Sequence, residues 1–416
     1  MTINYSLHSA SNYFVEDLLE VVARNRGIKD INKIKNPSIN DVIHYSKLVN
    51  MDKALKVFDA FIQTGEVIDV ATIVDEDFDG IGSSSILTMY LEKNFPNVRM
   101  HFLFHKRKQH GITEHIMNQI NELDNLDILF TPDSASSDFD QHKELYERGI
   151  PVICLDHHTT PHLSEHAIVV NNQTSPEYSN KQLSGTGITM KFLEALDDFY
   201  GLDDSSTYKD ISAISQVADS IEIGNNPETL YLTYDGIKNL QNPLIKEFIF
   251  KTIGKWDKVY PHTLSFGLIP KFNAVIRVGT LEEKKKLFFT MIGREEEFYN
   301  TRTKKTESAI ETSVRISINA HSRQNTAKKK WLSKIKDKIA EQALNSRPIL
   351  VVTFNKKDKF DNALGGVIAS SLTNIYRKPV LMLTYNEEKK LYSGSIRGYE
   401  DFTPDLKAFL EELNVF

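Results

Sequence analysis

The sequence predicts an α/β protein with two α/β lobes, in which a doubly wound, mostly parallel sheet forms the larger lobe and a long helical connector leads to the smaller one. Strand-like and helix-like segments alternate from residue 67 onward, and the strand-like runs are β-branched and almost wholly apolar, as in parallel strands buried on both faces. A third observation is a nearly continuous helical pattern without proline at 281–345. The predicted domains are therefore 1–280, 281–345 and 346–416.

The first lobe begins with a helical leader and continues as a regular strand–helix alternation. Residues 12–26 and 51–64 show helical spacing and stop at glycines 27 and 65, which suit the end of a helix. The expected strands are 67–74, 98–104, 126–131, 151–155 and 166–171, with helices at 83–94, 113–122 and 138–148 between them. In such sheets ligands bind at the carboxyl ends of the strands.

The remaining elements follow the same reasoning. Two helices are expected at 187–198 and 207–220. In 266–279 polar residues are too few for a free loop, and Pro270 is expected to break a helix. The second lobe should contain strands at 348–354, 379–385 and 391–397 and helices at 364–377 and 403–413.

Composition points to a cytoplasmic globular protein without a membrane anchor. The 416 residues are 40% hydrophobic and 25% charged, and the single cysteine, Cys154, excludes an intramolecular disulfide. No signal peptide is recognisable, and no apolar run approaches the ~20 residues of a membrane span. A net charge of −6 argues against broad adhesion to nucleic acid, although the basic stretches 106–111 and 328–338 could line a cleft in which Trp331 or Phe104 stacks a base. The alternative for both stretches is a solvated helix face.

Acidic residues gather where strands end. Asp75, Asp77 and Asp79 alternate directly after the strand 67–74, and Gly80 follows them. Three carboxylates within five residues repel one another unless cations neutralise them. An acidic surface loop is the alternative interpretation of this segment taken alone.

Further acids and two histidines complete a predicted metal site. Asp133 follows the strand 126–131, Asp156 and the pair His157-His158 follow 151–155, and Asp219 lies in the apolar pattern of 207–220, where it needs a partner. Such an oxygen-rich set with almost no thiol favours Mg²⁺ or Mn²⁺, and two ions would suit phosphoester hydrolysis. No phosphate-binding P-loop pattern accompanies it.

With these residues in hand, the chain resembles the DHH phosphoesterase superfamily and, within it, the RecJ single-strand exonucleases. DEDFDGIGS, FTPDS, LDHH and QVAD stand where that family has its four acidic motifs. The segments 169–189, 266–279 and 365–398 are also similar, so the likeness spans nearly the whole chain. Glycine is replaced by Ser134 after the second acid and by Ser395 in the last segment, and the chain stops where larger relatives add an OB-fold.

The resemblance implies an exonuclease that degrades single-stranded DNA, more than RNA, from the 5′ end to 5′-mononucleotides by two-metal hydroxide attack, in DNA repair, recombination or replication. It implies Mn²⁺ or Mg²⁺ ligands at Asp75, Asp77, Asp79, Asp133, His157 and Asp219. His158 would contact the scissile phosphate, and Asp156 would orient the histidines or bind an ion. Substrate would meet Asn273, Arg277, Gly365, Gly366, Ser395 and Arg397.

Two other functions remain open from the sequence. One is a DHH phosphodiesterase of short oligonucleotides or cyclic dinucleotides. The other is a non-catalytic replication scaffold, which the complete set of acids disfavours. A single-strand-binding protein or a helicase is an expected partner of the exonuclease.

Overall fold

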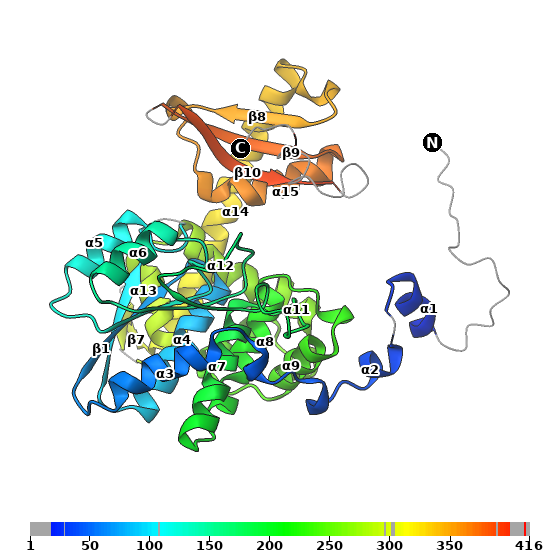
Figure 1. The fold of residues 1–416 in the computed structure, drawn as a ribbon. Helices are drawn as coiled ribbons and strands as arrows, with labels where there is room; N and C mark the ends of the chain where they lie inside the picture. The colour runs from blue at the N-terminus through cyan, green and yellow to red at the C-terminus, as the bar shows by residue number, and fades with distance from the viewer. Residues whose placement is uncertain are drawn as a thin grey trace. The chain divides into compact units, whose positions relative to one another are not determined.

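The computed structural model describes residues 18–28, 30–106, 109–294, 297–300, 304–387, 390–399 and 412 (Figure 1). The chain divides into two compact units. The first comprises Met1–His105, Gln109–Ile269 and Phe288–Arg294, and the second comprises Lys106–Lys108, Pro270–Leu287 and Glu295–Phe416. The predicted boundaries at 280 and 345 stay predictions.

The first unit is built on a five-stranded, fully parallel sheet in the order β2-β1-β3-β4-β5. Its strands are β1 (Ile68–Val74), β2 (Val98–Phe104), β3 (Ile128–Pro132), β4 (Val152–Asp156) and β5 (Ile168–Asn171). Every residue of β1, β3, β4 and β5 is buried, which confirms that the apolar runs are parallel strands covered on both faces. The strand order reverses between β1 and β3, so the switch point of the sheet lies at their carboxyl ends.

Helices cover both faces of this sheet, as the alternation of elements predicts. On one face Ile116 of α5 and Leu145 of α6 belong to a buried cluster with strand residues such as Ile73 and Leu129. On the other face Phe130 of β3 packs against aromatic rings of α3 and α7, with centroid distances of 6.3 Å to Phe58 and 5.7 Å to Phe192. The helices of this unit are α1 (Leu18–Asn25), α2 (Ile31–Lys35), α3 (Met51–Ile62), α4 (Phe78–Asn94), α5 (Glu114–Asn121), α6 (Phe139–Glu147), α7 (Gly185–Tyr200), α8 (Lys209–Ala218), α9 (Pro227–Lys238), α10 (Pro243–Thr252) and α11 (Pro261–Phe266).

The second unit carries a smaller mixed sheet in the order β10-β9-β8. Strands β8 (Leu350–Phe354) and β9 (Val380–Asn386) are parallel, and β10 (Leu391–Arg397) is antiparallel to β9. Helix α15 (Gly365–Tyr376) and the long helix α14 (Ala309–Glu341) contribute to its core. Trp331 of α14 packs edge-on against Phe354 and Phe360 in that core, and Phe104 is buried beside Phe288 in the first unit. Phe104 is therefore buried by packing, whereas Trp331 is only partly buried and its predicted role in base stacking stays a prediction.

Two predictions about local structure are wrong. Pro270 does not break a helix, because it is the second residue of α12 (Ile269–Val278), where a missing N–H leaves no hydrogen bond unmade. The stretch 281–345 is not wholly helical, since a short antiparallel pair, β6 (Phe298–Asn300) and β7 (Lys305–Glu307), lies between α13 (Leu281–Met291) and α14. The predicted helix 403–413 falls outside the described residues, except for the helical residue Glu412. Among the described helices, none combines the length and apolar character needed to cross a membrane.

Candidate active site

The predicted site residues of the first unit converge at the carboxyl edge of its sheet. Asp75 directly follows β1, Asp133 directly follows β3, and Asp156 is the last residue of β4. Strands β1 and β3 flank the reversal in strand order, where ligands bind in open α/β sheets, and β4 lies next to β3. Asp79 in the first turn of α4 and Asp219 at the end of α8 complete the group.

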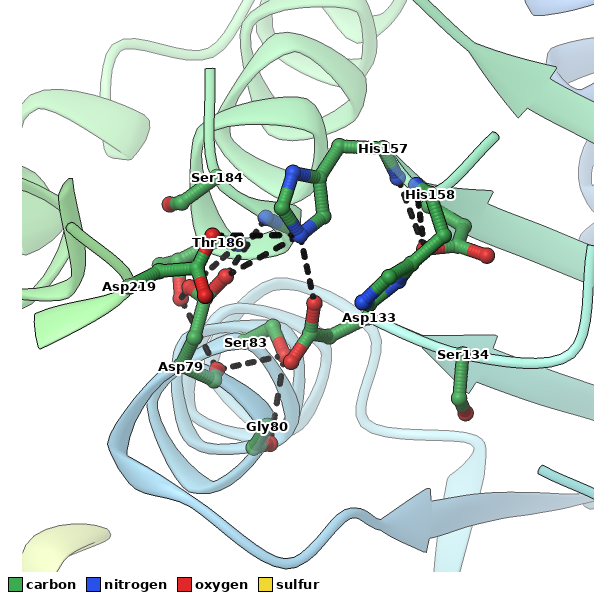
Figure 2. A network of polar contacts seen from close by, with 12 residues as sticks. Asp79, Gly80, Ser83, Asp133, Ser134, His157, His158, Ser184, Thr186 and Asp219 are labelled. Carbon is green, nitrogen blue, oxygen red and sulfur yellow. Dashed lines mark hydrogen bonds and ion pairs between the residues drawn. The ribbon is translucent and has the colours of Figure 1, made fainter. Parts of the chain in front are cut away.

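His157 lies at the centre of three carboxylates (Figure 2). Its Nε2 is 3.2 Å from Asp133 Oδ1, 3.5 Å from Asp219 Oδ2 and 3.9 Å from Asp79 Oδ2. Neither His157 Nε2 nor Asp133 Oδ1 has a hydrogen-bond partner within the described part of the chain, although both atoms are buried. Buried polar atoms are costly without partners, so this pair fits a site that is completed by a cation.

Two ligand groups share His157 as a member. Ligand atoms of Asp79, His157 and Asp219 lie within 4.8 Å of one another, and so do those of Asp133, Asp156, His157 and His158. Carboxylate oxygens with one or two imidazoles are ligands that suit Mn²⁺ and also Mg²⁺. Among the described residues, Asp75 and Asp77 belong to neither group.

The electrostatics of the site also favour bound cations. Burial raises the pKa of Asp133 well above its ordinary range, and the charges of Asp79, Asp77 and Asp75 raise it further. Burial and the charges of Asp79 and Asp77 raise the pKa of Asp219 to about 7. Because like charges crowd a buried space, a divalent cation would relieve the repulsion and keep both groups ionised.

The two histidines have opposite electrostatic environments. Burial lowers the pKa of His157, so its imidazole is neutral and able to ligate a metal. A hydrogen bond from His158 Nδ1 to Asp156 Oδ1, 2.8 Å long, raises the pKa of His158 to about 9, so this ring carries a positive charge at neutral pH. His158 is half-exposed and therefore available to an anion.

Asp156 is held in place by hydrogen bonds to both of its carboxylate oxygens. Its Oδ1 accepts hydrogen bonds from the backbone N–H groups of His157 and His158 at 2.7 and 3.2 Å, and its Oδ2 accepts one from Ser136 N at 3.2 Å. Burial alone would raise the pKa of Asp156, but the hydrogen bond and charge of His158 lower it below its ordinary range. These contacts tie both histidines to Asp156, and its orienting role stays a prediction.

Asp79 is anchored by the start of α7, a contact that the sequence did not reveal. Its carboxylate accepts hydrogen bonds from Gly185 N at 2.7 Å, Thr186 N at 2.9 Å and Thr186 Oγ1 at 2.6 Å. Backbone N–H groups at a helix N-terminus attract anions. The signal was the SGTG segment before a helix, whose Gly185 lets the helix approach Asp133 so closely that a Cβ there would lie 2.7 Å from the Asp133 Cα.

The backbone after β3 is unusual at the site. Asp133 and Ala135 adopt left-handed conformations with φ of 61° and 73°. Such conformations are uncommon outside glycine and cluster at functional sites. Ser134 does not have a positive φ, so a glycine is not required where the RecJ pattern has one.

A cavity of about 310 Å³ adjoins the ligand groups. It is lined by His110, Gly111, the segment from Asp133 to Asp138, Asp156 and His158. Two of these lining residues, Asp156 and His158, come from the DHH motif. His110 belongs to the stretch 106–111, which the sequence suggested as a possible basic wall of a cleft, and Asp138 belongs to a stretch that sequence reasoning had not assigned to the site.

The second unit contains a basic cavity of about 420 Å³ that collects most of the predicted substrate-binding residues. Its lining includes Arg277, Gly366, Ser395 and Arg397, together with Lys328 of α14, the segment 362–363 and further residues of α15 such as Ser370, and none of the described lining residues is acidic. Gly365 is adjacent, because a Cβ there would lie 3.0 Å from Ser395 Oγ. Asn273 is buried and is not among the lining residues.

Comparison with known proteins agrees with this geometry. Residues 69–224 match the DHH family, N-terminal domain. A putative SPbeta prophage-derived single-strand DNA-specific exonuclease, YorK of Bacillus subtilis (strain 168), is 36% identical over 409 residues, covering 96% of this chain and 69% of YorK. The single-stranded-DNA-specific exonuclease RecJ of the same organism is 27% identical over 337 residues, covering 79% of this chain and 39% of RecJ.

The fold comparison leads to the same group of proteins. RecJ of Thermus thermophilus in complex with Mn²⁺ matches with a TM-score of 0.68 at 19% identity, covering 87% of this chain and 49% of that one. The same protein with Mg²⁺ matches with a TM-score of 0.59 at 17% identity, covering 87% and 47%. The chain thus spans about half of the RecJ chain whose fold it shares. Because its likeness to YorK covers both proteins broadly, the chain belongs to the RecJ-like branch of the DHH family.

Proposed function

We propose that the chain is a metal-dependent exonuclease that hydrolyses phosphodiester bonds of single-stranded DNA from the 5′ end and releases 5′-mononucleotides. The observation that carries this proposal is the buried His157 Nε2 among three carboxylates, with no hydrogen-bond partner in the described residues. Relatives named single-strand DNA-specific exonucleases support the choice of substrate. Repair, recombination or replication is the setting we propose for this activity.

Asp79, Asp133, His157 and Asp219 would hold the ions, with Asp77 beside them at the start of α4. When bound, two Mn²⁺ or Mg²⁺ ions supply Lewis-acid stabilisation of the phosphate charge and acidify the attacking water. His157 contributes a neutral imidazole, and Thr186 and Gly185 hold the carboxylate of Asp79 in place. Groups that orient a ligand in this way sustain metal affinity.

His158 would bind the scissile phosphate. Its imidazolium, fixed by Asp156, faces the 310 Å³ cavity next to the ligand groups. A positive charge held in advance of the reaction stabilises the negative charge that grows on the phosphate oxygens during displacement.

The basic cavity of the second unit would bind another phosphate of the strand. Arg277, Lys328 and Arg397 supply positive charge, and Ser395 and the first turn of α15 supply further donors. Arg397 is held for this task by hydrogen bonds to Ser370 Oγ and to the Ile396 carbonyl oxygen, at 3.2 and 2.7 Å. We assign this cavity to the 5′-terminal phosphate.

The proposal is tested with DNA and RNA oligonucleotides labelled at the 5′ or 3′ end, in Mn²⁺ or Mg²⁺. We expect the 5′-labelled DNA to release labelled mononucleotide at once, and Asp133→Asn and His157→Ala to abolish release. Release from the 3′ end alone would refute the polarity, and cleavage of dinucleotides in preference to long strands would favour the oligonucleotide phosphodiesterase. Wild-type protein that binds Mn²⁺ but degrades nothing would favour a scaffold.

The role of the basic cavity has its own test. Arg397→Ala should reduce the preference for a 5′-phosphorylated over a 5′-hydroxyl strand, because the guanidinium is the group that reads the terminal charge. Arg323→Ala is the matched control, since Arg323 pairs with Glu283 and does not line the cavity. An unchanged phosphate preference in Arg397→Ala would refute the assignment.

A further inference from the structure

Two aspartate–histidine pairs line the cavity beside the ligand groups, and only one of them belongs to the DHH motif. In the first, His158 Nδ1 lies 2.8 Å from Asp156 Oδ1. In the second, His110 Nδ1 lies 2.5 Å from Asp75 Oδ2. In both pairs the carboxylate is buried and the imidazole is about half-exposed, at 56% for His158 and 50% for His110.

Asp75 is placed for a histidine partner by the strands themselves. It follows β1, and His105 follows the neighbouring parallel strand β2, so the two residues lie side by side at the same edge of the sheet. His105 is fully buried, with its Nε2 3.8 Å from Asp75 Oδ1. The carboxylate of Asp75 therefore lies between two imidazoles, whereas Asp79 and Asp219 lie with His157 in a ligand group.

The loop that carries His110 is attached to the cavity wall. Gly111 has a φ of +72°, and the next residue, Ile112, donates its backbone N–H to Asp138 Oδ2 at 2.6 Å. Asp138 belongs to the same wall as Asp133, since both line the cavity with His110. The hydrogen bond from Ile112 N to Asp138 and the contact of the His110 ring with Asp75 together give His110 a defined position at the cavity.

We propose that His110 is a second phosphate-binding residue of the site, and that Asp75 acts through His110 and not as a metal ligand. This inference rests on the proposed nuclease function and assigns a role to a histidine outside the family motifs. A carboxylate that accepts from one ring nitrogen fixes the orientation of the ring and favours donation from the other. His110 and His158 would then each donate a hydrogen bond to a non-bridging oxygen of the phosphodiester held in the cavity.

The chain offers a matched control for this pair. His101 and Asp69 form another aspartate–histidine pair on the same two strands, with His101 Nε2 2.6 Å from Asp69 Oδ1. Asp69 precedes Asp75 by six residues of extended chain, which is roughly 20 Å of strand. His101→Ala therefore removes a similar contact outside the cavity.

The test compares His110→Ala, His110→Gln and Asp75→Asn with His101→Ala, using single-stranded DNA and Mn²⁺. We expect kcat/KM to fall about 10- to 100-fold in His110→Ala, the effect of losing a hydrogen bond to a charged group. The kcat/KM of His110→Gln, which keeps a hydrogen-bond donor, should lie between those of wild type and His110→Ala. The kcat/KM of His101→Ala should stay within about twofold of wild type. Equal kcat/KM values for His110→Ala and His101→Ala would overturn the proposal.

Metal binding and mutant coupling distinguish this role from a structural one. Titration calorimetry with Mn²⁺ and no DNA should give wild-type affinity for His110→Ala and Asp75→Asn but weaker binding for Asp79→Asn. The double variant Asp75→Asn/His110→Ala should lose no more kcat/KM than either single variant, because the two residues act as a unit. Weaker Mn²⁺ binding in Asp75→Asn with unchanged thermal unfolding would make Asp75 a ligand and refute the proposal. Wild-type protein without nuclease activity would instead refute the proposed function.

Discussion

Replacing Thr186 with valine should weaken metal binding without disturbing the fold around it. The Thr186 hydroxyl is 2.6 Å from Asp79 Oδ1 and 2.9 Å from Ser215 Oγ, and it is fully buried. Since a hydroxyl has one proton, the hydrogen bond to the carboxylate uses it, and Ser215 then donates to Thr186. Valine has nearly the same shape, so the change removes the hydrogen bonds to Asp79 and to Ser215 and leaves no cavity.

The expected loss of metal affinity follows from the hydrogen bonds that the Asp79 carboxylate accepts. Asp79 accepts from two backbone N–H groups and one hydroxyl, and the backbone donors remain in the variant. A hydrogen bond to a charged group contributes about 1.5–3 kcal/mol. Loss of a group that orients a metal ligand lowers metal affinity about 10- to 100-fold, which agrees with that range.

The assay is calorimetric titration of Mn²⁺ into Thr186→Val, with Thr186→Ser as the control that keeps the hydroxyl. The Kd of Thr186→Val for Mn²⁺ should rise about 10- to 100-fold, and the Kd of Thr186→Ser should stay near that of wild type. The concentration of Mn²⁺ for half-maximal nuclease activity should rise in parallel. Equal Kd values for the valine and serine variants would refute the idea that this hydroxyl sustains the metal site.

Two further substitutions test the packing and the buried charges of the first unit. Gly185→Ala should destabilise the protein by about 1–3 kcal/mol and abolish activity, because the added Cβ would overlap Asp133. Gly224→Ala is the control, since its Cβ would meet no atom within 4 Å, and it should change neither stability nor activity. Urea unfolding measures the stability of both variants. Burial, with a contribution from the charge of His166, lowers the pKa of His142 to about 4, so the unfolded state binds more protons below pH 6.5. Between pH 6.5 and 5 wild type should therefore lose about 2 kcal/mol more of its free energy of unfolding than His142→Leu, because the other titrating groups contribute equally to both; equal changes would contradict the assignment.

The sequence predicted the strands well because burial on both faces leaves an uninterrupted apolar signal. That signal identifies β1, β3, β4 and β5, whereas strands 98–104 and 391–397 were predicted with their observed bounds although both are partly exposed. The start of α4 was placed five residues late, at 83 instead of Phe78. Gly80 and Gly82 weaken the helical signal there, yet both are needed where α4 approaches Asp75 and Ser215 closely.

The site was predictable to the extent that its residues follow strands. Asp133, Asp156 and His157 could be placed together because parallel strands end at one edge. His110 and Thr186 could not, since their contacts with Asp75 and Asp79 join segments 35 and 107 residues apart in the chain. Such contacts depend on the packing of whole elements, and a local pattern such as the SGTG segment does not identify the partner.

The left-handed backbone at Asp133 restricts which residues can occupy that position at all. With φ at 61°, a β-branched or bulky side chain would strain the chain regardless of its chemistry, and asparagine, aspartate and glycine are the residues that tolerate this conformation best. Selection for folding alone would thus accept asparagine or glycine at 133 as readily as the native residue. Only selection for the chemistry of the site retains an acid there, so mutational tolerance measured separately for abundance and for activity should diverge most sharply at this position.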